Sequence, residues 1–165
     1  MSMHDTHESM SGEPDEGRYS RQLVLPVILP EGQARLARST LVIIGCGALG
    51  SVQAGLAARA GIGRLIVVDR DVLELHNLPR QVLFDERDVH ERLPKAVAAA
   101  RHLREINSAI EVEGIVADAT PITVEELIGP ADVILDGTDN FDTRFLLNDA
   151  AIRAGKPWVY GGVLG

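Results

Sequence analysis

From residue 41 onward, short apolar runs alternate with longer segments in which apolar residues recur at helical spacing. The runs at 41–44 and 65–68 are apolar throughout, as expected of strands that are buried on both faces of a parallel sheet, whereas residues 111–116 alternate between polar and apolar. The predicted strands are 41–44, 65–68, 111–116, 133–135 and 158–160. The predicted helices are 50–60, 94–106 and 141–154, with a short helical turn at 124–128. This alternation predicts an α/β fold with a mainly parallel sheet between two layers of helices.

Two of the predicted helices carry apolar residues at a spacing that places them on one face. We expect these faces to pack on the sheet. The residues concerned are Val52, Leu56 and Ala60 in helix 50–60, and Val97, Leu103 and Ile106 in helix 94–106. Glycine follows the first helix at position 61 and asparagine follows the second at position 107, and both residue types commonly end helices.

Length and composition exclude several classes of protein. The 165 residues correspond to one domain with its own core. The 16 basic and 24 acidic residues give a net charge of −8, which argues against a broad surface for DNA or RNA. No apolar run of about 18 residues occurs, so we expect no membrane span. A single cysteine, Cys46, and no targeting signal favour a cytoplasmic protein without disulfides.

The two ends of the chain differ from the rest. Residues 1–17 hold five acidic residues and no Lys, Arg or aromatic residue, which predicts a disordered acidic tail before a domain at 18–165. The chain stops at Gly165, directly after the predicted strand 158–160, where a strand should lead into its next element. We therefore expect the N-terminal part of a longer domain, truncated after about its fifth strand.

A glycine-rich motif follows the first predicted strand. Residues 45–50 read Gly-Cys-Gly-Ala-Leu-Gly, a G-x-G-x-x-G pattern between a strand and a helix. Glycines allow a tight turn and a close approach of the backbone, and the helix N-terminus offers free N–H groups to a phosphate. The motif predicts that Gly45, Gly47 and Gly50 form a nucleotide-binding loop, although a glycine turn without a ligand is an alternative. Cys46 is interpreted as a small filler residue, not a nucleophile.

Asp69 ends the second predicted strand, where a carboxylate can accept both hydroxyls of a ribose. A nicotinamide-dependent dehydrogenase would share the glycine loop and this acid. The residues that follow are less typical of such an enzyme, because they place two cations and an amide beyond the strand ends, where the phosphates of a nucleotide would lie. Each of them taken alone is as easily a solvated surface residue. They are Asp71, Asn77, Arg80, Gln81 and Lys95.

The fourth predicted strand leads into Asp136-Gly137-Thr138-Asp139-Asn140 at the same edge of the sheet. Asp139 is a candidate ligand for Mg²⁺, a cation that is commonly held by one or two carboxylates together with phosphate oxygens. Alternatively, Asp139 or Asn140 only caps the following helix. Arg144 lies about one helical turn further on, where it either orients the aspartate or pairs with the phosphates.

Together these motifs resemble the MoeB/ThiF/HesA adenylyltransferases, whose nucleotide domain is shared with the ubiquitin-activating enzymes. The resemblance covers roughly residues 18–165 and implies a Rossmann-like three-layer α/β/α fold. The motifs that carry it are Arg18-Tyr19-Ser20-Arg21-Gln22, the loop at 45–50, Asp69-Arg70-Asp71, Asn77-Leu78-Pro79-Arg80-Gln81, Pro94-Lys95 and Asp136-Gly137-Thr138-Asp139-Asn140.

The resemblance implies a role for each matching residue. The three glycines of the loop would cradle the phosphates of ATP, and Asp69 would hold the ribose. Asp139 would hold Mg²⁺. Arg21 would reach into the nucleotide site of the second subunit of a homodimer. The residues that would bind and polarise the phosphates are Asn77, Arg80 and Lys95, with Asp71 and Gln81 as supports.

The implied reaction is an adenylation. The C-terminal Gly-Gly carboxylate of a ubiquitin-like sulfur-carrier protein attacks the α-phosphorus of ATP, pyrophosphate leaves and an acyl-adenylate remains. An ionised carboxylate needs no general base, so the protein has only to align the reactants and to neutralise charge on the phosphates. The carrier, and hence a thiamine, molybdopterin or cysteine pathway, is left open.

The chain departs from the family pattern in two places. Family members usually have a glycine shortly before the lysine, and residues 91–95 contain none. The family's crossover loop, its C-x-x-C zinc sites and a later-acting cysteine would all lie beyond Gly165, so zinc would be bound only through residues after it.

Three other functions remain alternatives. The same ATP site could activate a tRNA base or a peptide carboxylate. An NAD(P)-dependent oxidoreductase would need the loop and Asp69, but it has no use for Arg80, Lys95 and Asp139 acting together. A third alternative is a module that dimerises or binds a nucleotide without turnover.

Overall fold

The structure is a computed structural model that describes residues 16–162. Most of the predicted tail, residues 1–15, lies outside the described residues, as do residues 163–165. Helix α1 (Glu16–Leu23) was not predicted, and its first two residues fall inside the stretch predicted to be a tail. None of the helices in the described range is long and apolar enough to cross a membrane.

Five strands and seven α-helices form the described part of the chain. The strands are β1 (Thr40–Ile44), β2 (Arg64–Val68), β3 (Glu111–Ile115), β4 (Val133–Asp136) and β5 (Trp158–Tyr160). The helices after α1 are α2 (Leu29–Arg38), α3 (Ala48–Ala60), α4 (Glu86–His90), α5 (Lys95–Ile106), α6 (Val124–Ile128) and α7 (Phe141–Ala154), with a 3₁₀ turn η1 (Leu75–Asn77).

The strands form one sheet in the order β3-β2-β1-β4-β5, and every neighbouring pair is parallel. The chain moves outward from β1 in one direction to β3, and then returns to add β4 and β5 on the other side. Ile44 pairs with Val68 of β2 and with Asp136 of β4, so the ends of these three strands are level. In sheets of this kind, ligands bind beyond the strand ends where the order reverses, here between β1 and β4.

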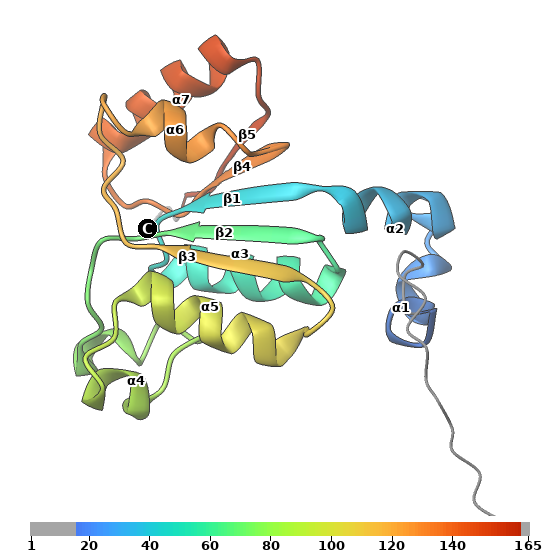
Figure 1. Ribbon diagram of the computed structural model, residues 1–165, viewed down its shortest axis with the longest axis horizontal. Coiled ribbons are helices and arrows are strands. Elements are labelled where there is room, and N and C mark those ends of the chain that lie inside the picture. Colours follow the sequence, from blue (N-terminus) through green and yellow to red (C-terminus); the bar gives the residue numbers. More distant parts are fainter. Residues whose placement is uncertain (1–15, 163–165) are drawn as a thin grey trace, which may run out of the picture.

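Helices cover both faces of the sheet, which confirms the predicted three-layer α/β/α fold. Helices α3, α4 and α5 lie on one side, and α6 and α7 lie on the other (Figure 1). Alternate residues of β1 enter two separate cores, because successive side chains of a strand point to opposite faces. Leu41 and Ile43 pack with α3 and α5, whereas Val42 and Ile44 pack with α6 and α7.

The predicted inner face of α3 is wrong. Val52 and Leu56 are exposed, and the buried side of the helix carries Ala54 and Ala58. The small side chains of Ala54 and Ala58 let α3 lie close to the sheet and to α5. The face that carries these alanines therefore packs inward, although its residues are less hydrophobic than Val52 and Leu56. Val97 of α5 is also exposed, contrary to expectation.

Other expectations for these helices hold. Leu103 is fully buried and Ile106 is partly buried against the same core. Gly61 ends α3 and Asn107 ends α5, as predicted.

Helices α1 and α2 are held at the end of the sheet where the strands begin. Tyr19 is buried, and its hydroxyl accepts a hydrogen bond from the Asn107 amide at 2.9 Å. The amides of Gln22 and Gln33 both donate to the Ala60 carbonyl at the end of α3. Figure 1 shows α1 and α2 at the opposite end of the sheet from the loops that follow β1 and β4.

Candidate functional site at the carboxyl edge of the sheet

A cavity of about 920 Å³ opens at the carboxyl ends of β1, β2 and β4. This is the edge of the sheet at which the sequence predicts a nucleotide site. Gly50 is buried beneath the cavity, and Arg21 lies on α1 at the far end of the sheet. The other nine predicted site residues line the cavity: Gly45, Gly47, Asp69, Asp71, Asn77, Arg80, Gln81, Lys95 and Asp139.

Packing inside the protein requires glycine at two positions of the loop, Gly45 and Gly50. A Cβ at Gly50 would lie 1.9 Å from the Gly45 carbonyl oxygen. A Cβ at Gly137, in the loop after β4, would lie 2.3 Å from that same oxygen. Gly45 itself has a φ of +88°, a conformation that favours glycine. The loops after β1 and β4 therefore meet through glycines, and Gly137 is a member of this contact that the sequence analysis did not single out.

Gly47 differs from the other two glycines. A Cβ at this position would have only the Gln81 side-chain nitrogen near it, at 4.0 Å. No contact within the described residues therefore requires glycine here, and its effect is to leave the floor of the cavity open. Helix α3 starts immediately afterwards, with no side-chain cap and no acid in its first turn. Its first N–H groups and the positive end of its dipole are thus available to an anion.

Asp69 connects the end of β2 to the glycine loop. One carboxylate oxygen accepts the Cys46 N–H at 2.7 Å, and the other accepts the Asp71 N–H at 2.8 Å. Each oxygen keeps a further lone pair, so the carboxylate can still accept ribose hydroxyls.

The Cys46 thiol is buried, and that burial raises its pKa to about 12, with a smaller contribution from the negative charge of Asp69. The thiol therefore stays protonated at neutral pH, in agreement with its interpretation as a filler residue.

Lys95 supplies a positive charge at one wall of the cavity. Its side chain is almost fully buried, and its ammonium donates to the Asp71 carboxylate at 2.8 Å. The Lys95 backbone N–H also donates to the Asp71 carbonyl at 2.8 Å, so the start of α5 is fixed against the end of β2. Because an ammonium has three donors, one bond to Asp71 leaves others for a ligand. Beside it, Arg70 pairs with Asp118 at 2.6 Å.

The turn before Lys95 keeps a glycine-like conformation without a glycine. Arg92 has a φ of +53°, in the left-handed region that a residue with a Cβ adopts at a cost of about 1 kcal/mol or more. The stretch 91–95 therefore contains one residue, Arg92, in a backbone conformation that a glycine would adopt more readily.

The amides and the second cation come from the segment around η1. Asn77 is buried, and its side-chain oxygen accepts the Glu74 N–H at 3.0 Å. Gln81 is also buried, and its side-chain oxygen has no partner among the described residues. Arg80 is exposed and donates to the His76 carbonyl at 2.7 Å. The three residues thus place one exposed cation and two buried amides along the same wall.

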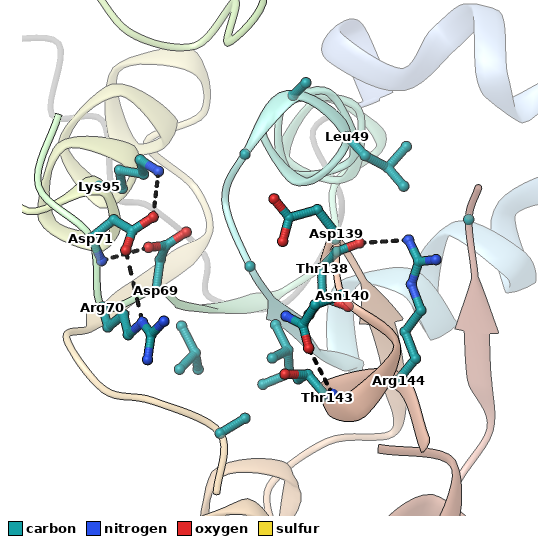
Figure 2. Close-up of a pocket in the computed structure, with 18 of the residues that line it drawn as sticks. Leu49, Asp69, Arg70, Asp71, Lys95, Thr138, Asp139, Asn140, Thr143 and Arg144 are labelled. Carbon is teal, nitrogen blue, oxygen red and sulfur yellow. Dashed lines mark hydrogen bonds and ion pairs between the residues drawn. The ribbon is translucent and has the colours of Figure 1, made fainter. Parts of the chain in front are cut away.

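Asp139 lies on the opposite side of the cavity from Lys95 and Asp71, with the glycine loop between them (Figure 2). Asn140 caps α7, because its side-chain oxygen accepts the Thr143 N–H at 2.9 Å. Asp139 is therefore not the cap. Its exposed carboxylate forms no hydrogen bond or ion pair with any residue in the range 16–162. A free carboxylate facing a phosphate-type loop is the donor set that suits Mg²⁺.

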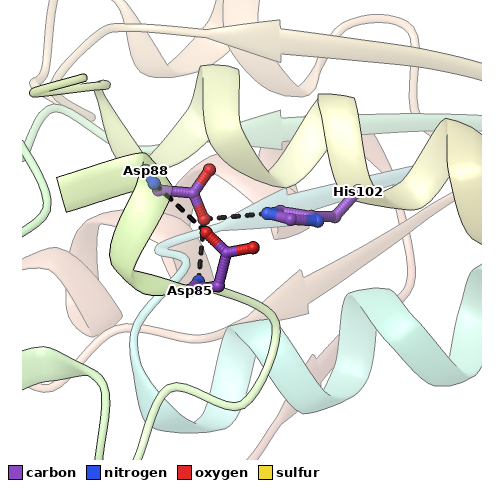
Figure 3. A group of neighbouring side chains, drawn as sticks. All are labelled: Asp85, Asp88 and His102. Atoms are coloured by element: carbon purple, nitrogen blue, oxygen red, sulfur yellow. Dashed lines mark hydrogen bonds and ion pairs between the residues drawn. The ribbon is translucent and has the colours of Figure 1, made fainter. Parts of the chain in front are cut away.

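A second group of metal-type ligands lies outside this cavity. Oxygens of Asp85 and Asp88 and a ring nitrogen of His102 lie within 4.8 Å of one another (Figure 3). Their partners within the protein account for them. Asp85 caps α4 by accepting two backbone N–H groups, and the buried Asp88 carboxylate is paired with His102 at 2.8 Å and with Arg101. The group joins α4 to α5.

The strand order and the glycine loop between β1 and α3 define a Rossmann-like α/β domain. Within that class, the chain belongs to the ThiF family, whose family model matches residues 19–165. The sequence is 48% identical over 149 residues to the sulfur carrier protein ThiS adenylyltransferase of Bacillus subtilis, covering 90% of this chain and 44% of the relative. It is 43% identical to the sulfur carrier protein adenylyltransferase of Thermus thermophilus, covering 88% and 53%.

A solved structure has the same fold. It is the tRNA N6-threonylcarbamoyladenosine dehydratase TcdA of E. coli in complex with ATP, with a TM-score of 0.80, 24% sequence identity and coverage of 87% of this chain and 58% of that one. The chain thus spans about half the length of the curated relatives it matches.

Proposed function

We propose that this chain supplies the ATP site of an adenylyltransferase that activates the C-terminal carboxylate of a ubiquitin-like sulfur-carrier protein. The observation that carries the proposal is the open floor at Gly47, with cations on one wall of the cavity and a free carboxylate on the other. Two relatives named as adenylyltransferases of sulfur-carrier proteins support this choice of substrate.

The phosphates of ATP would lie over Gly47 and the first turn of α3. Lys95 approaches from one side with its remaining donors, and Arg80 is exposed and free to turn toward the same place. The ribose would lie at Asp69, whose oxygens keep one lone pair each. Asn77 and Gln81 are buried amides along the same wall, and the side-chain oxygen of Gln81 has no partner among the described residues.

Asp139 would hold Mg²⁺ at the other wall. Its carboxylate fits a hard cation because it is exposed to the cavity and has no partner in the described part of the chain. When bound, the cation would neutralise charge on the phosphates and on the leaving pyrophosphate.

The adenylation step itself requires few further groups from the protein. A carboxylate oxygen of the carrier forms a bond to the α-phosphorus, the bond from that phosphorus to the bridging oxygen of the β-phosphate breaks, and pyrophosphate leaves with the electron pair. No proton is transferred in this step. The chain's own residues align the two reactants and offset negative charge, which is the usual basis of phosphoryl-type catalysis. The protonated Cys46 takes no part.

Arg21 would act in a second copy of the chain. It lies on α1, beside Tyr19 and Gln22, whose side chains fix that helix at the start of the strands. The cavity lies at the other end of the sheet. An arginine so placed does not reach the nucleotide of its own subunit, so its role in the proposal requires a homodimer. We also place this reaction in the cytoplasm, and any zinc would be bound only through residues beyond Gly165.

The direct test is ATP–pyrophosphate exchange by the complete gene product. Exchange should require a sulfur-carrier protein that ends in Gly-Gly, and a carrier whose last glycine is deleted is the matched control. Exchange without any carrier would point to a different substrate, such as a tRNA base or a peptide carboxylate. Tighter binding of NAD⁺ than of Mg-ATP would instead favour an oxidoreductase, and nucleotide binding without exchange a silent module.

A further inference from the structure

Arg144 is placed to control the loop that carries Asp139 without touching Asp139. Its guanidinium donates to the Thr138 carbonyl at 2.7 Å and to the Tyr160 hydroxyl at 3.2 Å. It also stacks near two rings, with its central carbon 4.8 Å from the centre of Tyr160 and 5.3 Å from that of Phe141. Figure 2 shows that Arg144 reaches the backbone just before Asp139, while the Asp139 carboxylate points away from the guanidinium. The guanidinium is half-buried and held from three directions.

Thr138 is held on its other side as well. Its N–H and its hydroxyl both donate to the same oxygen of the buried Asp136 carboxylate, at 2.9 and 2.6 Å. The peptide groups before and after Thr138 are therefore both fixed, one by Asp136 and the other by Arg144. Asn140, which follows Asp139, is fixed by its cap on α7. Asp139 thus lies between two fixed backbone segments.

The orientation of one peptide group decides where Asp139 points. The Thr138 carbonyl belongs to the peptide group that joins Thr138 to Asp139, so rotating that group changes the φ angle of Asp139 and swings its Cβ. The carboxylate itself has no partner to hold it in the described residues. A ligand without bonds of its own depends on its backbone for its direction, and groups behind a metal ligand commonly set metal affinity in this way.

We propose that Arg144 is a positioning residue for magnesium: by holding the Thr138 carbonyl, it aims the Asp139 carboxylate into the cavity. The inference rests on the proposed function, because it needs Mg-ATP as the ligand. It also links the metal ligand to the end of β5, since Tyr160 anchors the guanidinium. The competing role is a direct contact with the nucleotide, for which the buried and unpartnered Nε of Arg144 would be available.

The test measures the affinity for ATP by calorimetry over a range of magnesium concentrations, and again in the presence of EDTA. In Arg144→Ala, the magnesium concentration that gives half of the increase in ATP affinity should rise about tenfold. The affinity for ATP in EDTA should stay within about twofold of wild type. Arg144→Lys should behave like Arg144→Ala, because an ammonium keeps the charge but cannot span the carbonyl and the hydroxyl as a planar fork does.

Three further variants make the result interpretable. Tyr160→Phe removes one hydrogen bond and keeps the ring, so it should fold and raise the magnesium requirement about threefold. Arg153→Ala on the same helix, an exposed residue paired with Glu125 at 3.2 Å, is the matched control and should change nothing. In the Asp139→Asn background, Arg144→Ala should cause no additional loss, because the two residues act through one ligand.

Two results would overturn the inference while leaving the proposed function intact. An equal loss of ATP affinity with and without magnesium would make Arg144 a direct nucleotide contact. An unchanged magnesium requirement in both Arg144→Ala and Tyr160→Phe would show that Asp139 needs no such support. If the wild-type chain binds ATP with no dependence on magnesium, Asp139 holds no metal, and the magnesium part of the proposed function fails together with this inference.

Discussion

Replacing Gly50 by alanine tests the packing of the glycine loop most sharply. The new Cβ would lie 1.9 Å from the Gly45 carbonyl oxygen, and contacts of this kind are essentially never shorter than 3.0 Å. The loop and the start of α3 would therefore have to separate by about 1 Å, and overpacking of this type costs about 1–3 kcal/mol. Because the displaced groups form the floor of the cavity, affinity for ATP should fall as well.

Gly55→Ala is the matched control on the same helix. Its Cβ would approach only the end of the flexible Arg59 side chain, at 3.3 Å. Alanine is the better helix former by up to about 1 kcal/mol, so this variant should be as stable as wild type or more so. In thermal unfolding, each kcal/mol should shift the melting temperature by about 2–4 °C for a chain of this size. The reasoning is refuted if Gly50→Ala melts and binds ATP like Gly55→Ala.

Three further predictions concern Cys46, Asn107 and Arg92. Because burial raises the Cys46 pKa to about 12, the thiolate fraction of Cys46 rises only as the pH approaches that value. A thiol reagent at pH about 8 should therefore label the unfolded chain but not the folded one. Asn107→Ala removes the donor to Tyr19 and Ala58 from a fully buried position. In urea titration this variant should lower the free energy of unfolding by about 2–3 kcal/mol, whereas Tyr19→Phe should lower it by about 1 kcal/mol. Equal losses in the two variants would contradict this ranking. Arg92→Gly should relieve the strain of the left-handed backbone before Lys95 and raise the melting temperature. Arg87→Gly inside α4 is the control and should lower the melting temperature. A lower melting temperature in both variants would mean that a contact of Arg92 stabilises the fold by more than its backbone strain costs.

The two central strands β1 and β2 could be predicted closely because each is buried on both faces. Leu41 to Ile44 and Leu65 to Val68 leave no ambiguity of period, and the structure extends each strand by only one residue. The grouping of the site also followed, since the carboxyl ends of parallel strands share one edge. Asp69 and Asp139 thus come to the same cavity although 70 residues separate them in the sequence.

Other features depend on contacts that the sequence does not display. The inner face of α3 is formed by Ala54 and Ala58, and their small size becomes an advantage only once α5 and the sheet are in place. The link from Tyr160 through Arg144 to Thr138 requires the pairing of β4 with β5.

Helices α2 and α4 were not predicted, although the sequence carries local signals for both. Asp85 and Asp88 form a capping box at the start of α4, and Pro30 lies in the first turn of α2.

Calorimetric titration of the chain with Mg-ATP and with NAD⁺, repeated for Asp139→Asn, tests the central claim most directly. Mg-ATP should bind more tightly than NAD⁺, and Asp139→Asn should lose the magnesium-dependent part of that affinity while its melting temperature stays within a few degrees of wild type. Tighter binding of NAD⁺, or an Asp139→Asn variant that keeps its full response to magnesium, would contradict the account.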